Sequence, residues 1–330
     1  MVSEARKLKY GVPQGSILGP LLFSLYVTPL EDVIRKHGCH TVIFADDTQL
    51  YITCDSGDSI SVIESCVRDI KEWMSSNFLS LNESKTEVFI FTSRHKRNQS
   101  QYVNKFKVGE VTVKTTSIVR NLGVIFDHNG TMSQQVSQIC KSASHSLWRI
   151  GKIRHLLDNK SAEKIVHAFV TSRLDYCNSI LAGLPQSLLQ RLQIIQNSAA
   201  RLIRRIHKHQ HLSMTTILKE LHWLPIDVRI QFKMLCIVFK CIHLSTAPTY
   251  LKDLISVKDS GHHNLRSSDT LTLHTPTKRT LKSYGDRAFA VRAPVLWNAL
   301  LPSLRQIDSF PTFKCRLKTH LFQKFYKTSI

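Results

Sequence analysis

Two adjacent aspartates, Asp46 and Asp47, are the residues of this sequence best suited to chemistry. They stand between two β-prone runs, TVIF and TQLYIT, which predicts a β-hairpin with the carboxylates at its tip. Adjacent carboxylates repel each other unless a cation neutralises them, and hard cations such as Mg²⁺ prefer carboxylate oxygens. In phosphoryl transfer, two such ions activate the attacking hydroxyl and stabilise the leaving oxygen. The alternative is a solvated turn, because aspartate is common in turns.

The residues before this pair predict a loop that leads into a helix. The stretch begins GVPQGSILGP, and Leu18, Leu21, Leu22 and Leu25 then recur at helical spacing. Ser16 is expected to cap this helix. Proline lacks a backbone N–H and clashes with the preceding turn, so Pro29 is expected to kink or end it.

The residues after the pair predict a helix and then strands. Apolar residues recur every three or four positions from about Asp58 to Asn77, which predicts an amphipathic helix. Residues 79–93 predict a turn followed by a strand, and residues 106–127 predict further strands. Beyond about Asp127 strand signals fade and helical patterns dominate, as in PQSLLQRLQIIQNSAARLIRRI.

The net charge and the cysteines indicate which kind of partner the protein binds and in which redox compartment it occurs. Its 330 residues carry a formal charge of +21, which favours polyanionic partners such as nucleic acid. The eight cysteines include no CxxC pair, so we expect free thiols in a reducing compartment. Cys236, Cys241 and His243 lie in an apolar run and predict a buried helix, with a zinc site as the alternative.

No apolar run of the sequence is long enough to span a bilayer, and the first ten residues have no signal-peptide core. We therefore expect an intracellular protein without a membrane partner. The basic clusters SRHKRN and RRIHKH are weak nuclear-import candidates, so the sequence assigns neither nucleus nor cytoplasm.

Four segments resemble the ordered motifs of retroelement reverse transcriptases. They are GVPQGSILGPLLF at 11–23, FADDTQLY at 44–51, LSLNESKTEVFIF at 79–91 and NLGVIFD at 121–127. Their order and spacing both match that family. Three segments further down the chain are similar in sequence to non-LTR (LINE) elements of the CR1/L2 type: SRLDYCN, QNSAARLI and LHWLPIDVRI. The resemblance covers essentially the whole chain.

The resemblance implies an α+β fold: a partial right-hand polymerase palm, with an antiparallel sheet and helices, followed by a mostly helical thumb and C-terminal region. The expected divisions are a palm at 1–127, a helical thumb-like region at 128–257, a linker or loop at 258–286 and a C-terminal helical segment at 287–330. Asp46 and Asp47 would be metal-binding catalytic aspartates of a two-Mg²⁺ site. The implied partners are an RNA template, a DNA primer or duplex and, in the full-length enzyme, dNTP.

The resemblance also assigns roles to other residues. Those expected beside the incoming nucleotide and template are Pro13, Gln14, Gly15, Ser16, Phe44 and Ala45. Lys85 would lie near the triphosphate as a catalytic proton donor to pyrophosphate, and Leu122 and Gly123 would help position the primer end. The residues themselves leave alternatives open: a structural turn for Pro-Gln-Gly, a solvated lysine for Lys85 and a packing glycine for Gly123.

The sequence departs from the family pattern upstream. In this family another metal-binding aspartate precedes the Gly-Val-Pro-Gln-Gly loop, whereas here the only acid before Gly11 is Glu4. We therefore expect a chain that is truncated, that lacks the fingers and one metal ligand, and that does not polymerise by itself. A palm without one central strand exposes a sheet edge, so the helical part, about 134–330, is expected to be the more robust unit.

Two alternatives to a polymerase role remain. The first is a non-catalytic remnant that binds RNA or DNA through basic helices, with Arg201, Arg204 and Arg205 on the helix predicted at 185–206. A solvated helix face is the competing interpretation of those arginines. The second is a plain protein-interaction or orphan product with no biochemical role. Steep salt dependence of RNA binding would separate the two.

Overall fold

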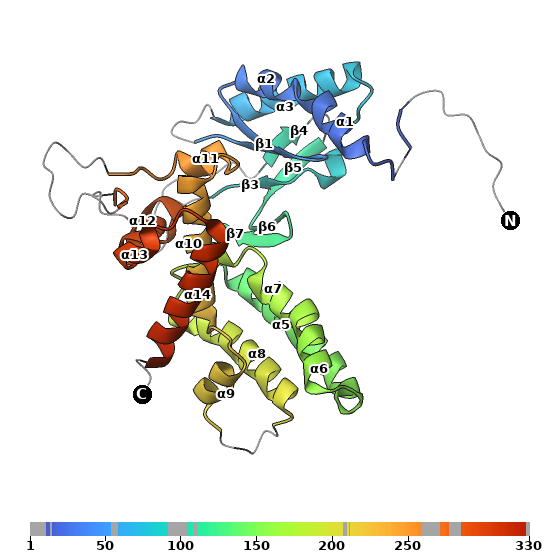
Figure 1. The fold of residues 1–330 in the computed structure, drawn as a ribbon. Helices are drawn as coiled ribbons and strands as arrows, with labels where there is room; N and C mark the ends of the chain where they lie inside the picture. The colour runs from blue at the N-terminus through green and yellow to red at the C-terminus, as the bar shows by residue number, and fades with distance from the viewer. Residues whose placement is uncertain are drawn as a thin grey trace, which may run out of the picture. The chain divides into compact units, whose positions relative to one another are not determined.

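A computed structural model describes residues 11–13, 15–53, 59–91, 105–108, 111–206, 210, 212–258, 271–276 and 285–327 (Figure 1). The chain divides into two compact units, Met1–Val119 and Arg120–Ile330. Helices dominate and the strands form small sheets, so the predicted α+β class is confirmed. The border at Val119 comes before the composition change near Asp127, and the four-part division made from the sequence stays a prediction.

The first unit contains helices and two small sheets. Its elements are α1 (Gly19–Val27), α2 (Leu30–Arg35), β1 (His40–Phe44), β2 (Asp47–Tyr51), α3 (Ser59–Ser76), the 3₁₀ turn η1 (Glu83–Lys85), β3 (Val88–Phe89), β4 (Lys105–Val108) and β5 (Val111–Thr116). The predicted hairpin and the predicted helix after it are confirmed as β1–β2 and α3. The separation of α1 from α2 at Pro29 confirms the expected break.

The sheet of β3, β4 and β5 corrects one prediction. β4 and β5 form an antiparallel hairpin, but β3 pairs in parallel with β5, so the expected antiparallel sheet is wrong at this pair. The physical reason is the strand order β3-β5-β4. Since the chain reverses once into β4 and again into β5, β3 and β5 run in the same direction.

The core of the first unit is small. α2 and α3 pack together, and the buried side chains between them and the hairpin are Leu30, Ile34, Cys39, Cys66 and Ile70. His37 and Asp69 add an ion-pair contact of 2.8 Å between Nε2 and Oδ2. This cluster fixes β1 against α2, and so fixes the base of the hairpin whose tip carries the aspartates.

Helix α1 differs from its prediction at its start and on its surface. Its first residue is Gly19, and Leu18 precedes it without a side-chain cap, so the expected Ser16 cap is wrong. Ser16 instead belongs to a preceding turn, where its carbonyl accepts from Gly19 N at 3.2 Å. The apolar side chains of α1 are largely exposed, and Val27 is its only buried residue.

The second unit is almost entirely helical. After β6 (Ile118–Asn121), which crosses the unit border, and β7 (Val124–Asp127), its elements are α5 (Ser133–Ile153), η2 (Arg154–Leu156), α6 (Asn159–Val166), the π-helical η3 (His167–Thr171), α7 (Ser172–Asp175), η4 (Asn178–Leu181), α8 (Gln186–Arg204), α9 (Met214–Glu220), α10 (Ile226–His243), α11 (Thr249–Lys252), η5 (Gly285–Arg287), α12 (Phe289–Asn298), α13 (Pro302–Arg305) and α14 (Phe310–Lys327). The helix predicted at 185–206 is confirmed as α8.

Helix α10 lies at the centre of this unit's core and packs against α8, α12 and α14. Phe239 stacks on Phe313 with ring centroids 4.4 Å apart. Cys236 and Cys241 are buried in α10, which confirms the buried helix predicted there. Burial lowers the pKa of His243, which lies in the same apolar setting.

Part of the segment predicted as a linker is anchored in this core. Leu273 is fully buried and pairs with Val257 in an isolated antiparallel bridge. The Asn298 side chain accepts from Leu273 N at 2.9 Å and donates to Leu273 O at 2.8 Å. Residues 271–273 are therefore packed against the core, since a solvated linker would leave these backbone groups to water.

No helix among the described ranges is both long enough and apolar enough to cross a bilayer.

Candidate active site

The β1–β2 hairpin places the two aspartates at adjacent positions of its tip. Phe44 pairs with Asp47 in the antiparallel register, which leaves Ala45 and Asp46 as the two-residue turn. Ala45 has a φ of 54°, and a positive φ at the first turn residue is what primed hairpin turns require. Asp46 therefore lies in the turn and Asp47 begins β2.

Both carboxylates are exposed. Neither side chain has a hydrogen bond or an ion pair with another described residue. Two adjacent anionic groups without a cationic partner form a site of concentrated negative charge, which attracts a hard cation. Mg²⁺ commonly binds through one or two carboxylates and keeps several waters or substrate phosphates, so this pair fits the protein side of such a site.

The described residues add no further ligand to this pair. Among the ranges that the structure covers, no group of three or more His, Cys, Asp or Glu side chains could hold a metal ion. The hairpin tip therefore supplies two carboxylates, and additional ligands would have to come from bound phosphate, water or residues outside those ranges.

The predicted nucleotide-side loop forms a turn that requires glycine. Ser16 N donates to Pro13 O at 3.1 Å, and Gly15 has a φ of 88°. A positive φ at the third residue of a hydrogen-bonded four-residue turn favours glycine at that position. A Cβ added at Gly15 would meet nothing within 4 Å, so conformation rather than crowding explains this glycine. Pro13 is exposed and Ser16 half-buried, while Gln14 lies outside the described residues.

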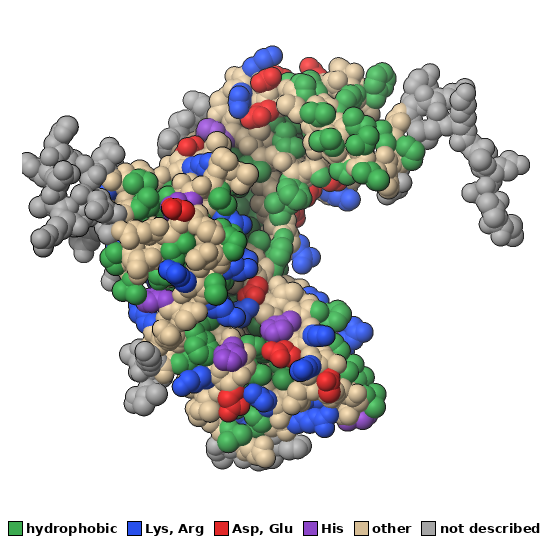
Figure 2. All heavy atoms as spheres, viewed as in Figure 1, with side chains coloured by type: hydrophobic (Ala, Val, Ile, Leu, Met, Phe, Trp, Pro, Cys, Tyr) green, Lys and Arg blue, Asp and Glu red, His purple; other side chains and the backbone are tan. Residues whose placement is uncertain are grey.

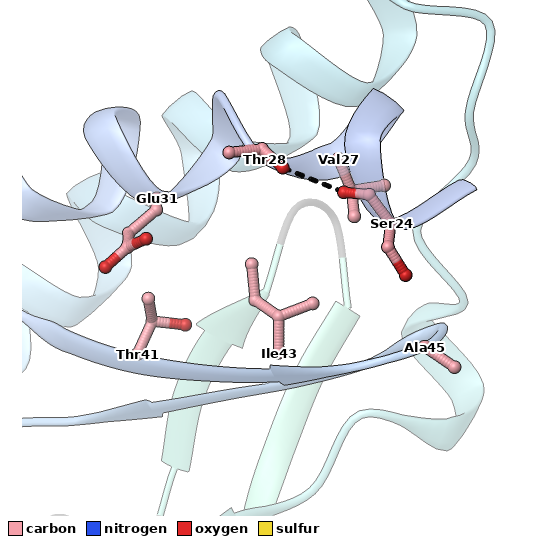
Figure 3. A pocket seen from close by; sticks show the side chains of 7 residues that line it. All are labelled: Ser24, Val27, Thr28, Glu31, Thr41, Ile43 and Ala45. Carbon is pink, nitrogen blue, oxygen red and sulfur yellow. Dashed lines mark hydrogen bonds between the residues drawn. The ribbon is translucent and has the colours of Figure 1, made fainter. Parts of the chain in front are cut away.

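A pocket of about 280 Å³ lies beside the hairpin, between α1, α2 and β1 (Figure 3). Its lining residues are Ser24, Val27, Thr28, Glu31, Thr41, Ile43 and Ala45. Figure 3 shows Thr41 and Ile43 pointing from β1 toward the helices. Phe44, in contrast, is 62% exposed, and the alternating burial of β1 puts it on the opposite face of the strand from Ile43.

The polar side chains that α1, α2 and their junction contribute to this pocket bond to neighbouring helical turns. Ser24 Oγ donates to Pro20 O at 2.9 Å, and Thr28 Oγ1 donates to Ser24 O at 2.9 Å. The Glu31 carboxylate accepts from Arg35 at 2.6 Å. The sequence did not predict this pocket, because its lining residues look like ordinary residues of two helices and a strand. No sequence signal marks it, because Ser24 lies on α1, Glu31 on α2 and Thr41 on β1, and only the fold brings them together.

Lys85 lies in the η1 turn, which is not hydrogen-bonded to the β1–β2 hairpin among the described residues. Its backbone N–H is accepted by the Asn82 side chain at 3.3 Å, and its side chain is exposed. The neighbouring Glu83 pairs with Lys71 at 2.7 Å, which ties the turn to α3. No hydrogen bond or ion pair in the part of the chain that the structure describes joins Lys85 to either aspartate.

Leu122 and Gly123 form the turn between β6 and β7 in the second unit. Both have positive φ angles, 44° and 81°, as a type I′ hairpin turn requires. The Tyr176 hydroxyl donates to Leu122 O at 2.7 Å, and a Cβ at Gly123 would lie 3.5 Å from the Tyr176 ring. Tyr176, which directly follows α7, therefore holds this turn, and Gly123 supplies the positive φ that the turn requires. The sequence predicted a strand through these two residues, so that prediction is wrong at this point.

The three arginines at the end of α8 each contact their own unit. Arg201 donates to Gln210 O at 3.3 Å, and Arg204 pairs with Glu220 at 3.1 Å. Arg205 donates to Leu157 O at 2.9 Å. Sequence patterns did not single out Arg154, which is buried beside them and donates to Leu202 O and Ile203 O at the end of α8.

Comparison with known proteins connects these features. Residues 2–126 match the family model described as reverse transcriptase (RNA-dependent DNA polymerase). The chain is 28% identical over 236 residues to the probable RNA-directed DNA polymerase from transposon X-element of Drosophila melanogaster, covering 67% of this chain and 25% of that protein.

A second relative is the probable RNA-directed DNA polymerase from transposon BS, also of Drosophila melanogaster. It is 24% identical over 213 residues, which cover 61% of this chain and 23% of that protein. The chain thus spans about a quarter of the length of these curated relatives. No solved structure is significantly similar to it.

Proposed function

We propose that this chain, whose residues 2–126 belong to the reverse transcriptase family, contributes the palm hairpin and a helical region to an RNA-directed DNA polymerase of a non-LTR retrotransposon. The observation that carries the proposal is the pair of exposed, unpaired carboxylates at the β1–β2 tip. The match of the family model to the residues around that pair supports it.

Asp46 and Asp47 are the residues that would hold Mg²⁺, the cation this family generally uses. When bound, such ions lower the barrier to phosphoryl transfer by stabilising charge on the attacking and leaving oxygens. The hairpin's own contribution is to fix two carboxylates on a short turn whose base is packed against α2. A rigid strand pair places ligands more accurately than a long loop.

The remaining candidate residues are proposed to contact the nucleotide, the template and the primer. Pro13, Gln14, Gly15 and Ser16, with Phe44 and Ala45, are proposed to lie beside the nucleotide and template. Lys85 is proposed to supply a positive charge and a proton near the leaving pyrophosphate. Leu122 and Gly123 are proposed to support the primer end, because a rigid turn held by Tyr176 can present backbone to a strand.

We also propose that the chain is catalytically silent by itself. A two-metal site usually needs more carboxylate oxygens than one pair supplies, and the described residues offer no third acidic ligand beside the hairpin. The proposed partners of the complete polymerase are an RNA template, a DNA primer and dNTP, and the proposed location is intracellular.

A metal-binding experiment tests the hairpin directly. Mn²⁺ substitutes for Mg²⁺ and broadens NMR signals of residues near its site. In the wild-type chain we expect broadening centred on the β1–β2 tip, and we expect it to disappear in the double variant Asp46→Asn with Asp47→Asn. Asp32→Asn, which removes another exposed carboxylate of the same unit, is the matched control and should leave the broadening unchanged. Equal broadening in the double variant would refute the proposed site.

Primer extension tests the catalytic part of the proposal. The purified chain with an RNA template, a DNA primer, dNTP and Mg²⁺ should give no product. Template-dependent product would overturn the proposed silence. A longer protein that contains this chain should extend the primer, and Asp47→Asn in it should lower the rate by about 1,000-fold or more, because metal charge stabilisation is worth several kcal/mol.

The second candidate function is nucleic-acid binding without chemistry, favoured by the charge of +21. Replacing Arg201, Arg204 and Arg205 with Ala should weaken RNA binding at low salt if they contact phosphate. Since all three also contact their own unit, a thermal unfolding measurement must accompany that test. Unchanged affinity in a folded variant would favour a solvated helix end.

A further inference from the structure

The outer face of α5 carries an exposed aromatic and basic stripe. The buried residues of this helix, among them Val136, Ala143 and Ile150, define the face that packs into the core. Directly opposite, at spacings of four, three and four residues, lie Lys141, His145, Trp148 and Lys152, which we call the α5 stripe. All four are exposed, so the helix leaves this stripe to solvent.

Trp148 is the centre of the stripe. Its side chain is 58% exposed, whereas Trp223 and Trp297 in the same unit are 5% and 0% exposed. The His145 ring is stacked near it at 6.0 Å between centroids, and Lys152 Nζ lies 3.7 Å from the indole centroid. A large indole exposed to water loses hydrophobic stabilisation that a flat aromatic ligand would restore.

The charge of the surrounding helices limits what that ligand can be. α5 contains Lys141, Arg149 and Lys152, and no Asp or Glu in its 21 residues. α8, which packs against α5, contains three arginines and again no acid in its 19 residues. Figure 2 shows Lys, Arg and His side chains over the visible face of the second unit, with fewer Asp and Glu side chains among them. This excess of positive charge favours a polyanionic ligand over a protein ligand whose surface has no acidic patch.

We propose that the α5 stripe binds single-stranded nucleic acid, with an unpaired base stacked on Trp148 and neighbouring phosphates held by Lys141 and Lys152. Exposed aromatic rings flanked by cations are the usual platform for unpaired bases. Lys152 has a long flexible stem, so its ammonium can move from the indole to a phosphate when a base arrives. The proposal rests on the nucleic-acid role proposed above and names the surface and the form of the ligand.

A duplex is a poorer fit to this geometry. Its bases are already stacked on one another, so a single convex helix surface with one central indole offers them no new stacking. A single strand gains both stacking and phosphate contacts. RNA and DNA single strands share this chemistry, and separate oligonucleotides distinguish them.

The experiment is a binding titration of the full chain with 12-nucleotide oligo(U), oligo(dT) and a mixed-sequence DNA duplex of equal length, between 50 and 200 mM salt. We expect tighter binding of the single strands and quenching of indole emission. Trp148→Ala should weaken single-strand binding by about 5- to 100-fold, the range for one stacked base. It should leave the salt dependence unchanged, because the indole carries no charge.

Two further variants separate stacking from charge. Lys152→Ala should reduce the slope of log affinity against log salt by about 0.7, the value for one phosphate contact on a single strand. Tyr250→Ala removes a 68% exposed aromatic ring from α11, which packs on α10, and should change neither affinity nor slope. Trp148→Phe should keep most of the affinity and lose the quenching due to this indole.

The outcomes that overturn the proposal are distinct. Single-strand affinity that is equal in wild type and in Trp148→Ala would refute stacking, while salt-dependent binding in both would leave the general nucleic-acid role intact. No binding of any oligonucleotide at 50 mM salt would refute both, without touching the Mn²⁺ test of the hairpin. A change of oligomeric state in Trp148→Ala, measured by sedimentation, would assign the stripe to a protein contact instead.

Discussion

Replacing Arg154 with Met should destabilise the second unit strongly. The guanidinium is buried and donates four hydrogen bonds: to Leu202 O at 2.8 Å, and to Leu157 O, Asn159 Oδ1 and Ile203 O at 2.6 Å each. Two of these acceptors are carbonyls in the last turn of α8, where the regular helical hydrogen bonds end; Leu202 O also accepts from Arg205 N at 3.3 Å.

The size of the effect follows from these four bonds. Each hydrogen bond to a charged group contributes about 1.5–3 kcal/mol. Methionine removes the desolvation cost of the buried charge, which offsets part of the loss. We therefore expect the free energy of unfolding to fall by about 3–5 kcal/mol.

Urea unfolding measures this change. Trp223 and Trp297 are both buried in the second unit, so their emission reports its unfolding. With a slope of about 1–3 kcal/mol per molar urea, the midpoint should fall by at least about 1 M. Arg149→Met makes the same replacement at an exposed site of α5 and should stay within about 0.5 kcal/mol of wild type. A loss below about 1 kcal/mol for Arg154→Met would refute the reasoning, since the four bonds would then carry no net stability.

Three other predictions concern conformation, thiols and local stability. Gly123→Ala should cost about 1–2 kcal/mol in urea unfolding because φ is 81°, whereas Gly151→Ala in α5 should be neutral or stabilising by up to about 1 kcal/mol; equal effects would contradict this. At pH 8 the exposed Cys177 and Cys315 should react with iodoacetamide before Cys66, because burial raises the pKa of Cys66 to about 12. Folded Cys66 keeps a proton that the unfolded thiol releases, so the first unit should also lose stability as the pH rises from 9 towards 12. A stability that stays constant over this pH range would count against the prediction. Hydrogen exchange should be at least about 100-fold slower in α8 and α10 than in α1, because α1 buries only Val27; comparable rates would refute the contrast.

The sequence predicted the elements whose periodicity is set by burial on one face. The hairpin around Asp46, helix α3 and helix α8 followed from spacing alone, because each buries one side against a neighbour. The sequence indicated a Pro-Gln-Gly turn, and Gly15 has the positive φ that glycine permits. It predicted a strand through Gly123, but the structure has a turn there between β6 and β7, so that part of the prediction is wrong.

Other features depend on long-range packing that local patterns do not carry. The parallel pairing of β3 with β5 depends on which strand lies between them. The leucines of α1 have helical spacing yet are exposed, because spacing shows a face and not what covers it. Arg154 follows other basic residues in the sequence, a pattern typical of a solvated surface. Only the structure shows that it donates to backbone carbonyls. The stripe around Trp148 was likewise invisible, since exposure of an indole is a tertiary property.

Helix α14 determines when the core of the second unit can close during synthesis. Phe313 and Leu317 of α14 are fully buried, and the Tyr326 hydroxyl donates to Trp223 O at 2.7 Å across 103 residues. Because α14 comes after α10 in the chain, α10 stays uncovered until α14 has been synthesised. Loss of α14 would therefore remove Phe313 from Phe239 and expose the core of the helical unit, which favours aggregation or degradation.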